Sequence, residues 1–163
     1  MRYWHKLSQM IEICRLFDDL PEKTGNISIR IKDKIVITPK GIRFKDLTRD
    51  SLVTLPGENK SSEWQLHDEV YKARADINAI IHTHSKYATQ AAHNNGLPGI
   101  QMAEFAPEGS IELATNTVKA LGIDNVCLLR NHGVVALGYD LNEALINIRS
   151  IEQYATDYYQ QIH

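Results

Sequence analysis

The sequence predicts an α/β domain whose central sheet is at least partly antiparallel and carries helices on both faces. Segments with apolar residues at helical spacing alternate along the chain with short, strand-like apolar runs. Two such runs, at residues 27–31 and 35–37, are separated only by Lys32, Asp33 and Lys34, which predicts a hairpin. The 163 residues suffice for one domain with its own core, spanning residues 1–163.

Before the hairpin, a helix is expected over residues 2–18, because apolar residues recur there at three- and four-residue spacing. The run Asp18-Asp19-Leu20-Pro21 is expected to end it. After the hairpin we expect a polar loop at residues 38–41, a short helical turn, and a short strand from 51 to 55.

The next helix is expected to run to about Arg74, and Ser61 and Ser62 are its N-cap candidates. Ser62 with Gln65 three residues later fits a capping box. Residues 77–82 form an apolar run that ends in polar residues, which predicts a buried strand.

Two further helices are expected at residues 85–94 and 109–121, the second ended by Gly122. Residues 126–129 and 134–137 are predicted to be strands on either side of a turn at 130–133. Asp140 and Glu143 can cap the last helix. Its apolar stripe is expected to comprise Ala144, Ile148, Ile151, Ala155, Tyr158 and Ile162.

Composition excludes several classes of function. The net charge is -2, with no basic stripe, so no nucleic-acid partner is expected. No apolar run is long enough to cross a bilayer, and residues 1–6 do not resemble a signal peptide, so a cytoplasmic location is expected. Cys14 and Cys127 lack metal-site spacing and are expected in the core.

The pattern His82-Thr83-His84 is the main sign of chemistry. Side chains alternate along a strand, so His82 and His84 point to the same side. Two imidazoles at a strand end often begin a zinc site, which usually needs a third protein ligand. Among the seven histidines, His132 is the best candidate, because Gly133 lets the backbone of its turn come close. A polar strand end and an unrelated turn histidine remain the alternative.

Glu63 and two small loops are weaker candidates. An acidic residue in a first helical turn can simply favour the helix dipole, but it can also be a base beside a metal. Both interpretations of Glu63 stay open on local sequence. Ser61 and Ser62 at a helix N-terminus suit an anion such as phosphate, and Lys40 in the loop at residues 38–41 would add a positive charge.

Taken together, five motifs in this order resemble the class II aldolase/adducin family. They are Thr24-Gly25-Asn26-Ile27-Ser28, Ile37-Thr38-Pro39-Lys40-Gly41-Ile42, Ser61-Ser62-Glu63-Trp64, His82-Thr83-His84 and Asn131-His132-Gly133. The resemblance runs from the first helix to the last and is strongest to the sugar-phosphate aldolases. It implies a three-layer α/β/α fold and a homotetramer with active sites between subunits.

By the same motif match, His82, His84 and His132 would ligate Zn²⁺ or another divalent transition metal. Glu63 would be the acid/base residue and a candidate fourth ligand. The residues implied to bind the substrate phosphate are Asn26, Lys40, Gly41, Ser61 and Ser62, with Lys40 standing where a small hydroxyl residue is common in the family.

The implied activity is aldol cleavage of a ketose 1-phosphate to dihydroxyacetone phosphate and an aldehyde, by a metal-dependent lyase. Dehydration of a methylthioribulose phosphate and decarboxylation of a sugar-acid phosphate are alternatives on the same scaffold. Epimerisation is less favoured, because related epimerases carry Asp in place of Glu63. A non-catalytic, adducin-like module would be expected to lose the metal ligands, which are all present here.

The sequence departs from the family pattern in two places. The family's catalytic tyrosine, donated by a neighbouring subunit, follows a segment that is Leu97-Pro98-Gly99-Ile100 here, yet Gln101 and Met102 come next. The connection from there to Leu121 is also shorter than usual. The chain ends at His163, directly after the last expected helix, where the family carries a tail that helps to cover the site.

Overall fold

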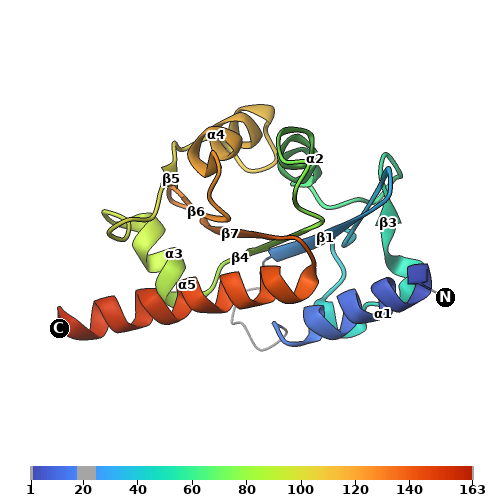
Figure 1. Cartoon of the computed structure of the whole chain (residues 1–163), viewed down its shortest axis with the longest axis horizontal. Coiled ribbons are helices and arrows are strands. Elements are labelled where there is room, and N and C mark those ends of the chain that lie inside the picture. The colour runs from blue at the N-terminus through green and yellow to red at the C-terminus, as the bar shows by residue number, and fades with distance from the viewer. Residues whose placement is uncertain (1, 18–24, 163) are drawn as a thin grey trace.

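Residues 2–17 and 25–162 are described in a computed structural model, in which a seven-stranded sheet lies between two layers of helices (Figure 1). The strands are β1 (Gly25–Ile31), β2 (Lys34–Ile37), β3 (Val53–Thr54), β4 (Ala79–Thr83), β5 (Met102–Ala103), β6 (Val126–Leu129) and β7 (Gly133–Gly138). Their order across the sheet is β3-β2-β1-β4-β7-β6-β5. Among these strands every neighbouring pair is antiparallel except β5 and β6, so the predicted antiparallel character and the β1–β2 hairpin are confirmed.

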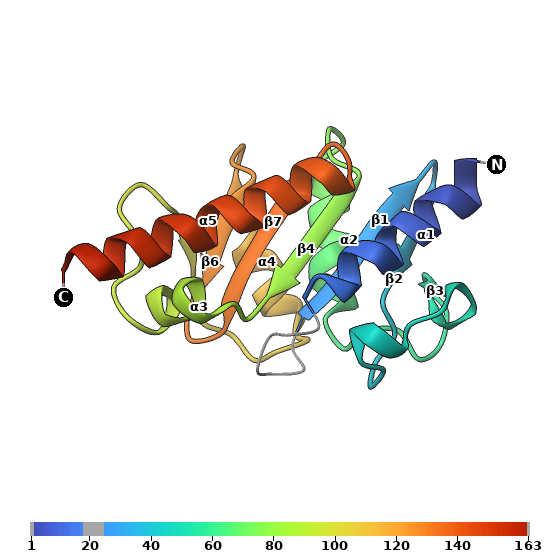
Figure 2. The same ribbon diagram turned by 90° about the horizontal axis from the view of Figure 1, so that it is seen from below.

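Five α-helices cover the two faces of the sheet within the part of the chain that the structure describes. They are α1 (Arg2–Arg15), α2 (Trp64–Ala73), α3 (Lys86–His93), α4 (Ile111–Leu121) and α5 (Leu141–Gln161), with single 3-10 turns at η1 (Phe44–Asp46) and η2 (Arg49–Ser51). Helices α2 and α4 lie on one face, and α1, α3 and α5 lie on the other (Figures 1 and 2). The three-layer α/β/α prediction is therefore confirmed.

The period-two alternation of strand side chains divides the core into two halves. In β4, Ala79 and Ile81 pack against α1, α3 and α5, whereas Ile80 packs against α2 and α4. The same alternation puts His82, two residues after Ile80, on the α2 side of the sheet. Cys14 and Cys127 are fully buried, one in each half of the core, as expected.

The start of α2 differs from the prediction. Glu63, not Ser61 or Ser62, is the N-cap residue, and the predicted capping box does not form. The chain first makes a turn in which the Trp64 amide donates to the Ser61 carbonyl at 3.1 Å, and Gln65 donates to the Gly109 carbonyl instead. This extra turn points the Glu63 side chain into the interior, where only 6% of the residue remains exposed.

Smaller differences have similar geometric causes. In α5 the buried stripe continues from Ala155 to Tyr159, four residues on, whereas the predicted Tyr158 is only partly buried and Ile162 is 55% exposed. Ile162 lies just beyond the end of α5, where little of the sheet remains to cover it (Figure 2). The two-residue strand β5 was not predicted, because so short a run carries no period. The predicted stop of the first helix, Asp18-Asp19-Leu20-Pro21, lies outside the described residues.

The helices do not resemble membrane spans. Within residues 2–17 and 25–162, none of them combines the length and the apolar character that crossing a bilayer requires.

The contribution of the α5 layer can be tested with two isoleucines on the same helix. Ile148 is 2% exposed and Ile146 is 63% exposed. Ile148→Ala is expected to lower the free energy of unfolding by about 2–5 kcal/mol, because it leaves a cavity under the sheet. Ile146→Ala should change it by less than about 0.5 kcal/mol. Urea unfolding followed by circular dichroism measures both, and equal losses would contradict the described orientation of α5.

Candidate metal centre

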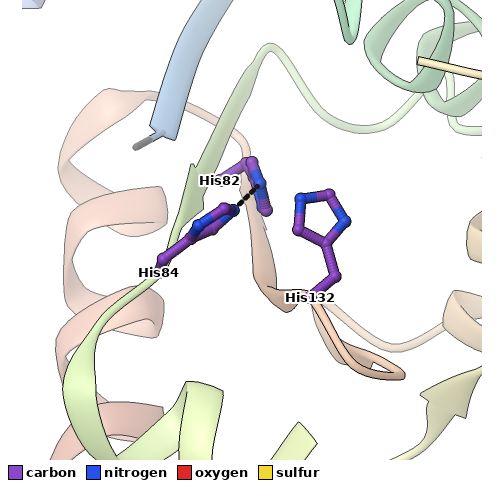
Figure 3. A group of neighbouring side chains, drawn as sticks. All are labelled: His82, His84 and His132. Carbon is purple, nitrogen blue, oxygen red and sulfur yellow. Dashed lines mark hydrogen bonds between the residues drawn. The ribbon is translucent and has the colours of Figure 1, made fainter. Parts of the chain in front are cut away.

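Three histidines meet at one end of the sheet (Figure 3). His82 and His84 come from the end of β4, and His132 comes from the turn between β6 and β7. Strand β4 pairs with β7 in a register that sets Thr83 opposite Val134, so the turn before β7 falls beside the end of β4. The three ring centroids lie 4.7–4.9 Å apart, and the predicted trio is therefore brought together.

The nitrogen atoms have the spacing of a metal site. All three ligand atoms lie within 4.8 Å of one another, and the Nε2 atoms of His82 and His84 are 3.1 Å apart. Two nitrogens bound at about 2.0–2.1 Å to a tetrahedral zinc ion would lie roughly 3.3 Å apart. His82 Nδ1 donates to the Val134 carbonyl at 2.9 Å, so Nε2 is the nitrogen of this ring that faces the centre and could bind a metal.

Gly133 allows the two strands to approach at this point. A Cβ atom built there would lie 2.5 Å from the Thr83 carbonyl oxygen and 2.8 Å from Cδ2 of His84. Only glycine fits without moving the β4 backbone, as expected from the sequence. Asn131, just before His132, has a φ of 57°, which the tight turn requires.

Glu63 reaches the same point from the start of α2. Its Oε2 lies 3.1 Å from His82 Nε2, and its Oε1 lies 3.4 Å from His132 Nε2. Asn26, opposite His82 in the β1–β4 pairing, donates from Nδ2 to Oε2 at 2.8 Å. Burial alone would raise the pKa of Glu63, but the positive charge and hydrogen bond of His82, with His132 and Asn26, outweigh burial and hold the pKa well below its usual range.

The histidines differ in their protonation. Burial, followed by the positive charge of His82, lowers the pKa of His84 to about 3 and that of His132 to about 4. Burial also acts to lower the pKa of His82, but the neighbouring Glu63 carboxylate outweighs it and raises the pKa. Neutral imidazole is the form that binds metals, so His84 and His132 already have the required form.

The residues fit a divalent transition metal. Nε2 of His132 and Oε1 of Glu63 are buried, yet neither has a hydrogen-bond partner. Leaving a buried polar atom unsatisfied costs about 1–3 kcal/mol, and both of these atoms face the centre of the histidine trio. Three imidazoles with one carboxylate nearby match the ligands of catalytic zinc sites, which keep one position open for substrate.

The predicted phosphate residues are only partly gathered here. Asn26 and Ser61 are buried beside Glu63, and Ser61 Oγ accepts a hydrogen bond from the Glu63 amide at 3.3 Å. The loop carrying Lys40 and Gly41 is joined to this segment, because the Ser61 amide donates to the Thr38 carbonyl at 3.2 Å. Lys40, Gly41 and Ser62 are exposed, and their role in binding phosphate stays a prediction.

Two residues near the site, Glu108 and His67, were not predicted. His67, on α2, contacts Asn26. Glu108 Oε1, on the loop between β5 and α4, lies 3.3 Å from His132 Nε2. Gly109 holds this loop close, since a Cβ atom there would lie 2.7 Å from the Ser62 carbonyl oxygen. Nothing local in the sequence connects residue 108 with residue 132, and a glycine before a helix cap was the only signal.

Comparison with known proteins agrees with this geometry. The sequence model of the family described as "Class II Aldolase and Adducin N-terminal domain" matches residues 8–159. The chain belongs to this family. Of the class II aldolase/adducin structures, one named L-fuculose 1-phosphate aldolase superposes with a TM-score of 0.90 at 32% identity, over 96% of this chain and 86% of its own. The family predicted from the five motifs is confirmed.

Two sequence relatives, both named as aldolases, match most of this chain. An L-fuculose phosphate aldolase from Methanococcus maripaludis is 35% identical over 170 residues, covering 91% of this chain and 93% of its own. A 5-methylthioribulose-1-phosphate/5-deoxyribulose-1-phosphate aldolase from Rhodospirillum rubrum is 29% identical over 156 residues, covering 83% of this chain and 71% of its own.

Removing one imidazole should abolish tight metal binding. His84→Ala leaves two histidines and an open pocket, so the purified protein is expected to lose its bound divalent metal, a fall of at least tenfold in metal content. Elemental analysis by mass spectrometry measures this content. His93→Ala, which removes a histidine from the end of α3, is the control and should retain the metal.

The charge of Glu108 should strengthen metal binding. Glu108→Gln removes a negative charge near His132, and we expect the dissociation constant for Zn²⁺ to rise roughly three- to tenfold. Glu104→Gln on the same loop is the matched control, because Glu104 lies beside Arg130 at 3.8 Å instead. Competition with a chromogenic chelator measures both constants, and equal values for the two variants would rule out this role for Glu108.

Proposed function

We propose that this protein is a metal-dependent lyase that cleaves a ketose 1-phosphate into dihydroxyacetone phosphate and an aldehyde. The observation that carries the proposal is the ionised, buried Glu63 carboxylate beside three convergent imidazoles. The prediction of an aldolase-type lyase is confirmed by relatives that carry aldolase names over nearly their whole length. The metal, which we infer to be Zn²⁺, and the exact sugar phosphate belong to the proposal.

The chain's own residues divide the work. His82, His84 and His132 would hold the metal, which supplies a Lewis acid for the carbonyl and hydroxyl oxygens of the substrate. Glu63 shuttles the proton at the carbon beside the carbonyl, a role that suits a carboxylate kept ionised by its neighbours. Its burial beneath the turn at Ser61 keeps bulk water away from that proton.

The substrate phosphate would bind where two segments meet at the start of α2. Ser61 and Ser62 lie just before α2, whose N-terminal amides and dipole favour an anion. Lys40 and Gly41 lie on the adjoining loop, and Lys40 adds a positive charge. Asn26 would contribute the second hydrogen of its amide, since the first is used by Glu63.

The remaining parts of the proposal rest on family resemblance. We infer that residues 1–163 act as one domain of a cytoplasmic homotetramer, with each active site completed by a neighbouring subunit. The large exposed side chains of Phe105 and Tyr139, 56% and 70% exposed, are apolar surface that such an assembly would cover. Sedimentation velocity would measure the assembly.

The deciding experiment measures dihydroxyacetone phosphate released from a panel of ketose 1-phosphates, in metal-loaded and chelated protein. Release is expected only with metal, and Glu63→Gln should lower kcat at least a hundredfold, because the amide cannot exchange the proton. Glu104→Gln, an exposed carboxylate on a nearby loop, is the control and should leave kcat within about twofold.

Other outcomes would redirect the assignment. A metal-replete, folded protein that releases no dihydroxyacetone phosphate would favour the dehydratase or decarboxylase alternative. Loss of water from the same panel would detect the first, and release of carbon dioxide from added sugar-acid phosphates would detect the second. Retained activity in Glu63→Gln would refute its role as the acid/base residue. A folded protein that takes up no divalent metal would favour the non-catalytic, adducin-like alternative.

A further inference from the structure

A continuous chain of buried polar side chains runs from Glu63 away from the metal centre. Asn26 bridges Glu63 and His67, since its Nδ2 lies 2.8 Å from Glu63 Oε2 and its Oδ1 contacts His67 Nε2. On the other side of the ring, His67 Nδ1 lies 2.6 Å from Ser28 Oγ, which is 3.0 Å from the Tyr71 hydroxyl. All of these side chains are at most 6% exposed.

The direction of the hydrogen bonds in this series follows from the Asn26 amide. Its Nδ2 donates to Glu63 Oε2, so its oxygen faces His67. An amide oxygen only accepts, so His67 carries its proton on Nε2. A neutral ring then accepts at Nδ1, and Ser28 must donate its hydroxyl proton to that nitrogen.

The far end of the chain supplies the last donor. Because the one proton of Ser28 Oγ is used by His67, the Tyr71 hydroxyl must donate to Ser28. Burial raises the pKa of Tyr71, which therefore keeps its proton. Arg30 lies over the Tyr71 ring, 4.9 Å from its centroid, and donates to the Tyr71 carbonyl at 2.8 Å, which anchors this end to the sheet.

His67 lies in the middle of this series of hydrogen bonds and uses both of its ring nitrogens. It lies on α2, four residues after Glu63, and is fully buried. Burial lowers the pKa of His67 to about 3, so the ring stays neutral and can donate on one side while accepting on the other. A charged ring would donate from both nitrogens, so Ser28 would accept from Nδ1 and the direction of its bond with Tyr71 would be reversed.

We propose that His67 is a positioning residue, which as the neutral Nε2–H tautomer fixes the amide of Asn26 and so aims the Glu63 carboxylate at the substrate carbon. The Asn26 amide has two orientations of nearly the same shape, and the bond from His67 Nε2 to its oxygen, together with the bond from its nitrogen to Glu63, selects the one observed. The consequence for catalysis rests on the proposed function of Glu63, whereas the tautomer of His67 does not.

The first test is the tautomer itself. Nitrogen NMR of protein labelled with ¹⁵N-histidine, assigned by the signal missing from His67→Gln, should show a neutral ring protonated on Nε2 between pH 6 and pH 8. A ring protonated on Nδ1, or one that becomes charged in this range, would overturn the proposal. This measurement needs no activity, so it decides the hydrogen-bond direction even if no ketose phosphate is cleaved.

The second test compares three substitutions of His67 that differ in whether, and where, they keep a hydrogen-bond donor. His67→Gln can still place a donor near the position of Nε2, whereas His67→Asn reaches only the position of Nδ1 and His67→Phe keeps neither. We expect kcat to fall about 10- to 100-fold in His67→Asn and His67→Phe, with KM and metal content within twofold of the unchanged protein. His67→Gln should recover most of kcat.

The pattern across the variants separates positioning from simple support of the fold. A residue needed only for packing would lose kcat in proportion to stability, and His67→Phe, the most apolar, would then be the least affected. That result, or equal kcat in His67→Gln and His67→Asn, would refute the proposal. If His67→Asn does not fold, a neutron crystal structure of His67→Gln, which locates the amide deuterons, must still show the Asn26 nitrogen on Glu63, and a reversed amide would refute the proposal.

Discussion

The antiparallel pairing of β4 with β7 determines where the functional atoms of this protein lie. Its register sets His82 opposite Val135, and the same pairing brings the Val134 carbonyl to His82 Nδ1. That single hydrogen bond selects the tautomer of a metal ligand, while the turn into β7 delivers His132. A shift of one residue would turn His82 and His84 to the opposite face, away from Glu63 and towards α3 and α5.

The buried negative charge of Glu63 is balanced by its neighbours. Glu63 is ionised inside the protein because it has basic partners on one side and an amide donor on the other. The neutral side chains behind Asn26 form a series of hydrogen bonds that ends on the Glu63 carboxylate. They stabilise the carboxylate without adding another charge, because an additional buried charge would be costly. The centre thus combines a strong local field with little net charge of its own, a combination suited to holding a divalent cation.

Much of this could be read from the sequence, for identifiable reasons. Side-chain periodicity predicted the helices, the β1–β2 hairpin and the pairing of His82 with His84, because period two and period 3.6 are local properties. The position of His132 followed from a turn flanked by two apolar strands and from Gly133. Local sequence left two interpretations of Glu63 open, as a residue that favours the helix dipole or as a base. The family resemblance then connected Glu63 with the histidines.

What escaped prediction depends on contacts between distant segments. The N-cap of α2 is Glu63 and not the predicted Ser61 or Ser62, because an extra turn before the helix buries the Glu63 carboxylate. Rules for helix capping consider only local sequence and do not predict such a turn. Glu108 reaches His132 only through the close approach of Gly109 to Ser62. His67 looked like one more residue of an amphipathic helix, and its function lies in partners 39 and 41 positions earlier in the chain.

The placement of the three histidines also bears on how the protein folds. His82 and His132 are 50 residues apart, and their strands must pair across the intervening α3, β5, α4 and β6 before the ligands meet. Non-local pairing of this kind forms late and slowly, so the metal site cannot nucleate the chain. A bound ion would then act mainly by slowing unfolding. The metal-bound protein would be more stable because β4 and β7 separate more slowly, and its folding rate would not change.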